Sequence, residues 1–284
     1  MPRDLPEDWP LRQYSQYITG PHHDWHVQVA GDGDCLLLLH GAGGSAHSFR
    51  DVLPLLETTF RVVVPDLPGH GFTRLGAQRR SGLAAMAQDI SELCQTQGWE
   101  PKAVIGHSAG AAIGLEMARH NPIEKLVGIN PALDTFDGIA GVLFPAIARV
   151  LASVPFAARI FSGASANPAR IKALIDSTGS HLTPEGLELY RRLVAREAHV
   201  NGALMMMAQW NLADLLRALP EITTDVLFLT GSNDTTVPPR VSAAAASKLP
   251  RVLHEDIPGY GHLIHEEAPE MIAKRILSFL HPKE

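Results

Sequence analysis

A serine stands at the corner between a predicted strand and a predicted helix. The apolar residues 103–105 predict a buried strand, and the small residues of 109–120 predict a helix. Between them Ser108 is flanked by Gly106 and Gly110 in the pattern Gly-x-Ser-x-Gly. Glycines at such a corner permit a sharp turn that exposes the serine oxygen above a sheet. A serine there can also serve only as a helix cap, but the pattern favours an α/β fold with a nucleophile at a strand end.

Two residues further along the chain can complete a catalytic triad with Ser108. Asp234 lies in the turn 231–238, directly after an apolar run, and His262 lies in a glycine-rich loop before the last predicted helix. The chain order serine, acid, histidine differs from the orders of the chymotrypsin and subtilisin folds. We therefore predict Ser108 as the nucleophile, His262 as its general base and Asp234 as the carboxylate that orients the histidine.

A glycine-rich loop follows an early predicted strand. Residues 35–40 form an apolar run that ends in a histidine, and the loop 41–44 contains three glycines and one alanine. Such a loop can turn its backbone N–H groups toward a negative charge that develops on a reacting oxygen. We expect the N–H groups of Ala42 and Ala109 to form an oxyanion hole.

Other residues could take the roles of the acid and the base. Asp134 follows a predicted strand and is an alternative acid. Asp234 is preferred because Gly-Ser-Asn-Asp is a turn that exposes a carboxylate. His254 and His265 are alternative bases, but His254 lies inside a predicted strand and His265 stands at the start of a helix. His262 is preferred because it follows a glycine-rich turn at a strand end.

Apolar runs alternate with helical patterns along most of the chain. This alternation predicts an α/β fold, with a mostly parallel sheet flanked by helices. A final helix is predicted over 269–280, where apolar positions recur on one face. The predicted strands are 26–30, 35–40, 61–64, 103–107, 126–130, 226–230 and 252–257.

The alternation stops between residues 131 and 220. We predict that this stretch is an inserted helical cap and that residues 1–130 and 221–284 form the core. Thr183 and Pro184 predict a helix start within the cap. Residues 139–156 and 205–207 are apolar, and core packing is the first expectation for them. The alternative is the wall of an apolar substrate pocket, with His107 packed against the cap. The pocket residues in that alternative are His107, Phe144, Phe156, Met206 and Trp210.

Composition excludes several classes of protein. The 284 residues are 45% hydrophobic and 19% charged, which suits a globular core with one insertion. A net charge of −6 argues against a nucleic-acid partner, because no basic surface is available to neutralise phosphates. No uncharged apolar run is long enough to span a membrane. A peripheral membrane contact through the apolar part of the cap stays open.

Cysteines, histidines and the first residues bear on compartment and metals. Cys35 and Cys94 fall in predicted buried elements and suit a reducing compartment. Residues 1–8 lack the apolar core of a signal peptide, so a cytoplasmic protein is expected. His22 and its neighbours His23 and His26 lack a carboxylate or thiol companion at metal-ligand spacing. We expect neither a metal nor a cofactor.

Several motifs together resemble a known family. The segments 40–44, 66–71, 106–110, 231–238 and 261–262 match the layout of α/β-hydrolases. Within that family the chain resembles the magnesium-chelatase accessory proteins of bacteriochlorophyll biosynthesis. The segments that carry this second resemblance are 25–28, 43–50, 106–113, 199–212 and 262–270. The resemblance implies a role near magnesium insertion into protoporphyrin IX in a photosynthetic bacterium, with a contact to the chelatase.

Three hypotheses about function follow. The first is a serine hydrolase that acts on a small apolar substrate such as a tetrapyrrole ester. The second is a non-catalytic accessory protein that binds a porphyrin or docks on the chelatase. The third is a generic carboxylesterase or carbon–carbon bond hydrolase unrelated to pigments. Fold alone does not separate them.

Overall fold

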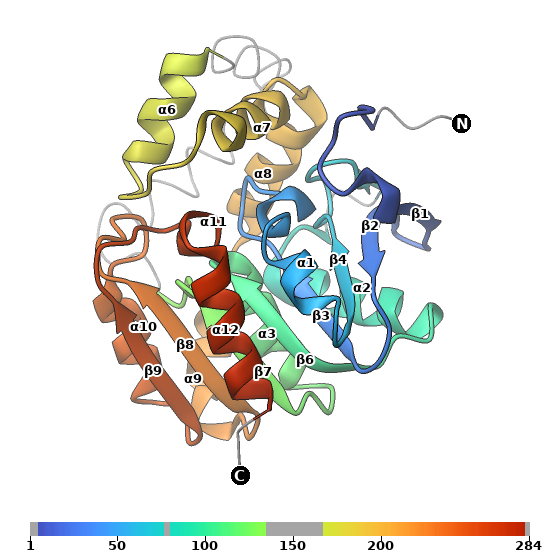
Figure 1. Cartoon of the computed structure of the whole chain (residues 1–284). Coiled ribbons are helices and arrows are strands. Elements are labelled where there is room, and N and C mark those ends of the chain that lie inside the picture. The colour runs from blue at the N-terminus through green and yellow to red at the C-terminus, as the bar shows by residue number, and fades with distance from the viewer. Residues whose placement is uncertain (1–4, 77–79, 135–166, 282–284) are drawn as a thin grey trace.

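One twisted sheet organises the molecule (Figure 1). The structure is a computed structural model that describes residues 5–76, 80–134 and 167–281. Within these residues the strand order is β1-β2-β4-β3-β6-β7-β8-β9, and β5 pairs with β2. Strands β4, β3, β6, β7, β8 and β9 pair parallel with one another. Strand β2 pairs antiparallel with β1, β4 and β5. The predicted fold class, a mostly parallel sheet flanked by helices, is confirmed.

The strands found match the predicted apolar runs, with two additions. The additions are β1 and β5, which sequence reasoning missed. The bounds are β1 (Ser15–Thr19), β2 (His23–Ala30), β3 (Cys35–Leu39), β4 (Arg61–Pro65), β5 (Arg74–Leu75), β6 (Pro101–His107), β7 (Lys125–Ile129), β8 (Asp225–Gly231) and β9 (Val252–Ile257).

Both faces of the sheet are covered, because successive side chains of a strand point to opposite faces. Leu37 and Leu39 of β3 belong to one core cluster, and Leu36 and Leu38 belong to the other. The first cluster includes side chains of α2 (Leu83–Thr96), α3 (Ala109–Ala118), α9 (Ala213–Ala218) and α10 (Pro239–Ala246). The second includes those of α1 (Leu53–Leu56) and α12 (Pro269–Leu280). Buried on both faces, β3 has five fully apolar or small residues and no alternation.

Three further helices lie together beyond the sheet, beside the loops that follow its strands (Figure 1). They are α6 (Pro168–Asp176), α7 (Pro184–Val194) and α8 (Glu197–Gln209). The predicted start of α7 is confirmed, since the Thr183 side chain accepts the Gly186 N–H. By contrast α9, which also lies within the predicted cap range 131–220, contributes Leu215 to the first core cluster. We therefore propose that the cap ends before α9.

The remaining elements are short. They are η1 (Arg12–Tyr14), η2 (Ala46–Phe49), η4 (Leu219–Glu221) and α11 (Ile264–Glu267). Among the helices described, none combines the length and the apolar character needed to cross a bilayer. The apolar segment 139–156, through which a peripheral membrane contact stays open, lies outside the described residues.

Candidate active site

Ser108 occupies a strained corner between β6 and α3. Its backbone has φ 52° and ψ −115°, a conformation that is costly for a residue with a side chain. A Cβ on Gly106 would lie 2.5 Å from the Ala111 Cα, and one on Gly110 would lie 2.8 Å from the His40 carbonyl oxygen. Only glycine fits at both flanking positions. The corner thus has the geometry expected of a nucleophile elbow.

Asp234 and His262 lie in hydrogen-bond contact on the loops after β8 and β9. The His262 Nδ1 to Asp234 Oδ2 distance is 2.6 Å, and both side chains are buried. The other carboxylate oxygen, Oδ1, accepts the N–H groups of Thr236 and Val237 at 2.8 Å each. An ionised carboxylate only accepts hydrogen bonds, so Nδ1 carries the imidazole proton and Nε2 is left as a base.

The alternative acid and bases lie in other surroundings. Asp134 is exposed. His254 lies in β9, where its Nε2 is 3.2 Å from Asp256 Oδ1. His265 is fully buried, and its ring centroid lies 4.4 Å from the ring centroid of His107. Burial lowers the pKa of His265 to about 3, so this imidazole is neutral. The structure brings Asp234, and not Asp134, to His262.

The predicted oxyanion loop passes beside Ser108. A Cβ on Gly41 would lie 3.1 Å from the Ser108 Cβ. Within residues 5–76, 80–134 and 167–281, neither the Ala42 N–H nor the Ala109 N–H donates a hydrogen bond. Unpaired N–H groups on both sides of a nucleophile can bind a developing oxyanion. Their role there remains a prediction.

Two buried histidines hold this loop, and sequence reasoning missed both roles. His40 Nδ1–H donates to the Gly41 carbonyl at 2.8 Å, while its Nε2 accepts the Leu67 N–H. His199, on α8, donates Nε2–H to the Gly43 carbonyl at 3.1 Å and accepts the Gly71 N–H at Nδ1. Burial lowers the pKa of both imidazoles, that of His199 to about 4. The helix α8 is thereby tied to the oxyanion loop.

A carboxylate anchors the neighbouring loop. Asp66 Oδ1 accepts the Ala46 N–H at 2.7 Å, and Oδ2 accepts the Phe72 N–H and the His26 Nδ1–H, each at 2.8 Å. Burial raises the pKa of Asp66, but the nearby His26 and the backbone donors outweigh it and hold the pKa well below its usual range. Asp66 is therefore an ionised, structural residue.

Acid is expected to weaken the fold through His199. Its folded pKa, about 4, lies below the ordinary value near 6.5, so stability is fully present above about pH 6.5 and is lost as the pH falls toward 4. Protonated Nδ1 could no longer accept the Gly71 N–H. The free energy of unfolding should fall by up to about 1.4 kcal/mol per pH unit for this group. Urea unfolding at pH 7.5 and 5.0 measures it, and His199→Gln should show a shallower pH dependence; an unchanged slope would contradict the assignment.

The predicted pocket residues have separate locations. Met206 is fully buried in the first core cluster, and Trp210 packs against that cluster. This agrees with core packing, the first expectation for the apolar part of the cap. Among the described residues His107 lies beside His262 and His265, and its predicted packing against the cap stays a prediction because residues 135–166 lie outside the described residues. The His107 Nε2–H donates to the His262 carbonyl at 2.9 Å, because β6 ends beneath the loop that carries His262. Phe144 and Phe156 lie outside the described residues.

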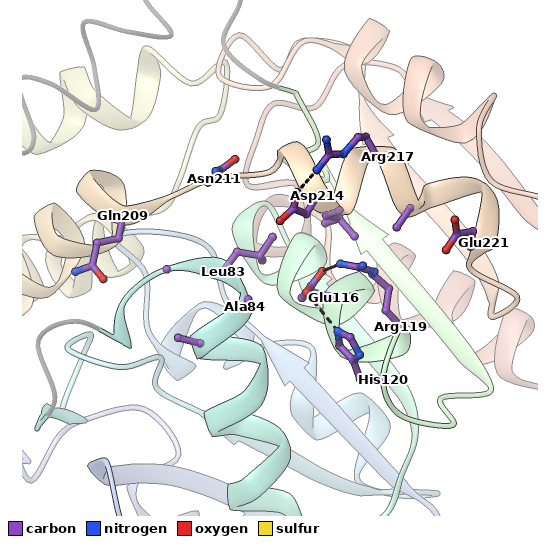
Figure 2. Close-up of a pocket in the computed structure, with 14 residues that line it drawn as sticks. Leu83, Ala84, Glu116, Arg119, His120, Gln209, Asn211, Asp214, Arg217 and Glu221 are labelled. Atoms are coloured by element: carbon purple, nitrogen blue, oxygen red, sulfur yellow. Dashed lines mark hydrogen bonds and ion pairs between the residues drawn. The ribbon is translucent and has the colours of Figure 1, made fainter.

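A polar pocket of about 770 Å³ opens between α2, α3 and α9 (Figure 2). Its lining includes Glu116, bound by Arg119 at 2.7 Å, and Asp214, paired with Arg217. None of Ser108, Asp234 and His262 lines it. Its arginines already bind carboxylates of the same wall, so they do not present unpaired charge to a ligand.

The early histidines belong to two separate networks, because His22 and His23 lie beside Asp89 whereas His26 bonds to Asp66. His22 lies with Asp89 and Glu92 in a group whose ligand atoms are within 4.8 Å of one another. Arg80 pairs with the Asp89 carboxylate, with 2.5 Å between the guanidinium nitrogen and Oδ1. His23 Nε2 lies 3.0 Å from the other oxygen, Oδ2. A guanidinium thus already neutralises the acid that a cation would need.

Comparison with known proteins finds similarity over nearly the whole chain. Residues 34–269 match the family described as alpha/beta hydrolase fold. The magnesium-chelatase 30 kDa subunit of Rhodobacter capsulatus is 47% identical over 281 residues, which cover 98% of this chain and 99% of that protein. A pimeloyl-acyl-carrier-protein methyl ester esterase of Xanthomonas oryzae pv. oryzae is 27% identical, with 84% and 91% covered. The structure of epoxide hydrolase CorEH without ligand has a TM-score of 0.79 at 23% identity and covers 94% of this chain and 98% of its own, a likeness of fold alone.

Proposed function

The chain belongs to the alpha/beta hydrolase fold family and is a homologue of a magnesium-chelatase subunit, and from this premise we propose that it is a serine hydrolase serving magnesium insertion into a tetrapyrrole. The observation that carries the hydrolase part is the 2.6 Å hydrogen bond between His262 and a doubly anchored Asp234, on loops beside the Ser108 corner. The name of the Rhodobacter relative supports the chelatase part.

The proposed chemistry is hydrolysis of an ester in two steps. Ser108 Oγ attacks the carbonyl carbon while His262 Nε2 takes its proton, and Asp234 stabilises the resulting imidazolium. The N–H groups of Ala42 and Ala109 bind the oxyanion. When the intermediate collapses, the ester C–O bond breaks, and the departing alcohol takes the proton from His262. A water molecule then attacks the acyl-enzyme and gives a proton to His262. As the bond between the acyl carbon and Ser108 Oγ breaks, Oγ takes that proton from His262 and the acid is released.

The substrate in this proposal is a small apolar ester, with a tetrapyrrole ester as the first choice. An esterase among the relatives supports ester chemistry, and the chelatase relative supports the tetrapyrrole and a contact with the chelatase. The reaction as written needs neither a metal nor a cofactor. The two buried free thiols, Cys35 and Cys94, suit the cytoplasm as the site of action.

A second candidate is a non-catalytic accessory that binds a porphyrin or docks on the chelatase. It is favoured by one observation, that the 47% identical relative is named as a chelatase subunit and not as a hydrolase. The third, a generic carboxylesterase or carbon–carbon bond hydrolase, is supported only by the more distant relatives.

A deletion strain of a bacteriochlorophyll-producing bacterium separates these candidates. Loss of the gene should lower bacteriochlorophyll and raise an early porphyrin. The wild-type gene should restore the pigment, and Ser108→Ala should not. The matched control is Ser242→Ala, which removes a buried hydroxyl from α10 and should restore the pigment fully. Restoration by Ser108→Ala would favour the non-catalytic accessory, and normal pigment in the deletion strain would overturn the chelatase role.

A further inference from the structure

Asn130 bonds to both loops that carry the acid and the histidine. It follows β7 directly and is fully buried. Its Nδ2 donates to the Gly261 carbonyl at 3.0 Å and to the His262 carbonyl at 2.7 Å. Its Oδ1 accepts the Gly231 N–H at 2.7 Å, at the start of the turn that leads to Asp234. One side chain thus spans the two loops.

The backbone on either side of Asn130 bonds to the third element of the site. The Ser108 N–H donates to the Ile129 carbonyl at 2.9 Å, and the Ala132 N–H donates to the Ser108 carbonyl at 3.2 Å. The end of β7 is therefore bonded to the corner of Ser108, while its Asn130 side chain reaches the other two elements.

The chemistry of this position calls for asparagine. Its φ is 44°, in the left-handed region that asparagine tolerates better than most residues. The three backbone partners require two donors and one acceptor, which a short amide supplies and a carboxylate or an aliphatic side chain does not. His107 also donates to the His262 carbonyl, but Asn130 joins the His262 loop to the Asp234 loop.

We propose that Asn130 is a positioning residue that sets the geometry between Asp234 and His262 relative to Ser108. It touches no reacting atom and acts through the two loop backbones. This inference rests on the proposed serine hydrolase function. Released loops would let the imidazole shift from its carboxylate, and a misplacement of about 1 Å can cost about 100-fold in rate.

The experiment compares Asn130→Gly and Asn130→Asp with the wild type. Glycine tolerates the φ of 44° and removes the amide, and aspartate keeps the size but places a carboxylate against two carbonyl oxygens. The matched control is Asn121→Ala, which removes an amide that bonds Ser91 Oγ and the Met117 carbonyl. Turnover of a p-nitrophenyl ester gives kcat and KM, and the low-field proton resonance of His262 Nδ1–H reports the bond to Asp234 without requiring turnover.

Both Asn130 variants should lower kcat by about 10- to 100-fold with little change in KM, and should weaken or shift the low-field resonance. Asn121→Ala should lower only the melting temperature. If Asn130→Gly does not fold, Asn130→Asp decides by the same readouts. An unchanged resonance and kcat in a folded Asn130 variant would overturn the inference. A wild type with no turnover, whose resonance is nonetheless lost in the variants, would instead remove the hydrolase proposal and leave the positioning role standing.

Discussion

Replacing Asp234 with asparagine is expected to slow acylation of Ser108 by about 10⁴-fold. The reason lies in the partners of the carboxylate. Oδ1 accepts the Thr236 and Val237 N–H groups, so an asparagine at this position must keep its oxygen there and turn its NH₂ toward His262. His262 Nδ1 would then have to accept, and the imidazole proton would move to Nε2, where it prevents proton transfer from Ser108. The burst of p-nitrophenol from a p-nitrophenyl ester measures the acylation rate.

Asp134→Asn is the matched control for this loss. Asp134 is the alternative acid that the sequence offers after β7, but it is exposed. Its replacement should leave the acylation rate within about twofold, since surface changes away from a site have small effects. If Asp134→Asn were the slow variant and Asp234→Asn the active one, the assignment of the acid would be wrong.

Gly110→Ala is expected to prevent the chain from reaching its folded state. The added Cβ would fall inside the contact distance of the Leu39 carbonyl oxygen and 2.8 Å from that of His40. These atoms belong to the last residue of β3 and the residue after it, in the middle of the sheet, where the backbone has little room to move. The cost should exceed about 4 kcal/mol, the range of exceptional single substitutions. Soluble yield and urea unfolding measure the effect.

Gly98→Ala provides the matched comparison. Gly98 has a φ of +66°, but a Cβ there would meet no atom within 4 Å. Its replacement should cost only about 1 kcal/mol, which is the conformational preference of glycine alone. Equal stability of the two variants would show that close packing at the elbow does not constrain Gly110.

The sequence was most informative where chemistry and local structure coincide. The apolar runs of β3, β6 and β8 show no alternation because both faces of these strands are buried, and such runs predict parallel strands directly. The corner around Ser108 was predictable for a similar reason. Its two glycines are required by contacts within β6 and α3 and with the neighbouring β3, so the local pattern carries the information.

The interactions that support the site could not be read in the same way. Asn130 bonds to Gly261 and His262, which lie 131 and 132 positions further along the chain, and His199 bonds to Gly43 across 156 positions. Neither has a local pattern, because an isolated asparagine after a strand or a histidine on a helix is common. The edge strand β1 was missed because its burial pattern mixes half-buried with exposed residues and forms no apolar run. Such features depend on tertiary contacts and follow only from the fold.

The most direct measurement of the serine hydrolase claim is labelling by a fluorophosphonate, followed by mass spectrometry of the intact protein and of its peptides. The probe phosphonylates a serine oxygen only where a neighbouring base activates it. We predict one adduct per chain, located on Ser108, absent from Ser108→Ala and retained in the Ser242→Ala control. A folded wild-type protein that stays unlabelled while a control esterase reacts, or an adduct at another residue, would contradict the claim.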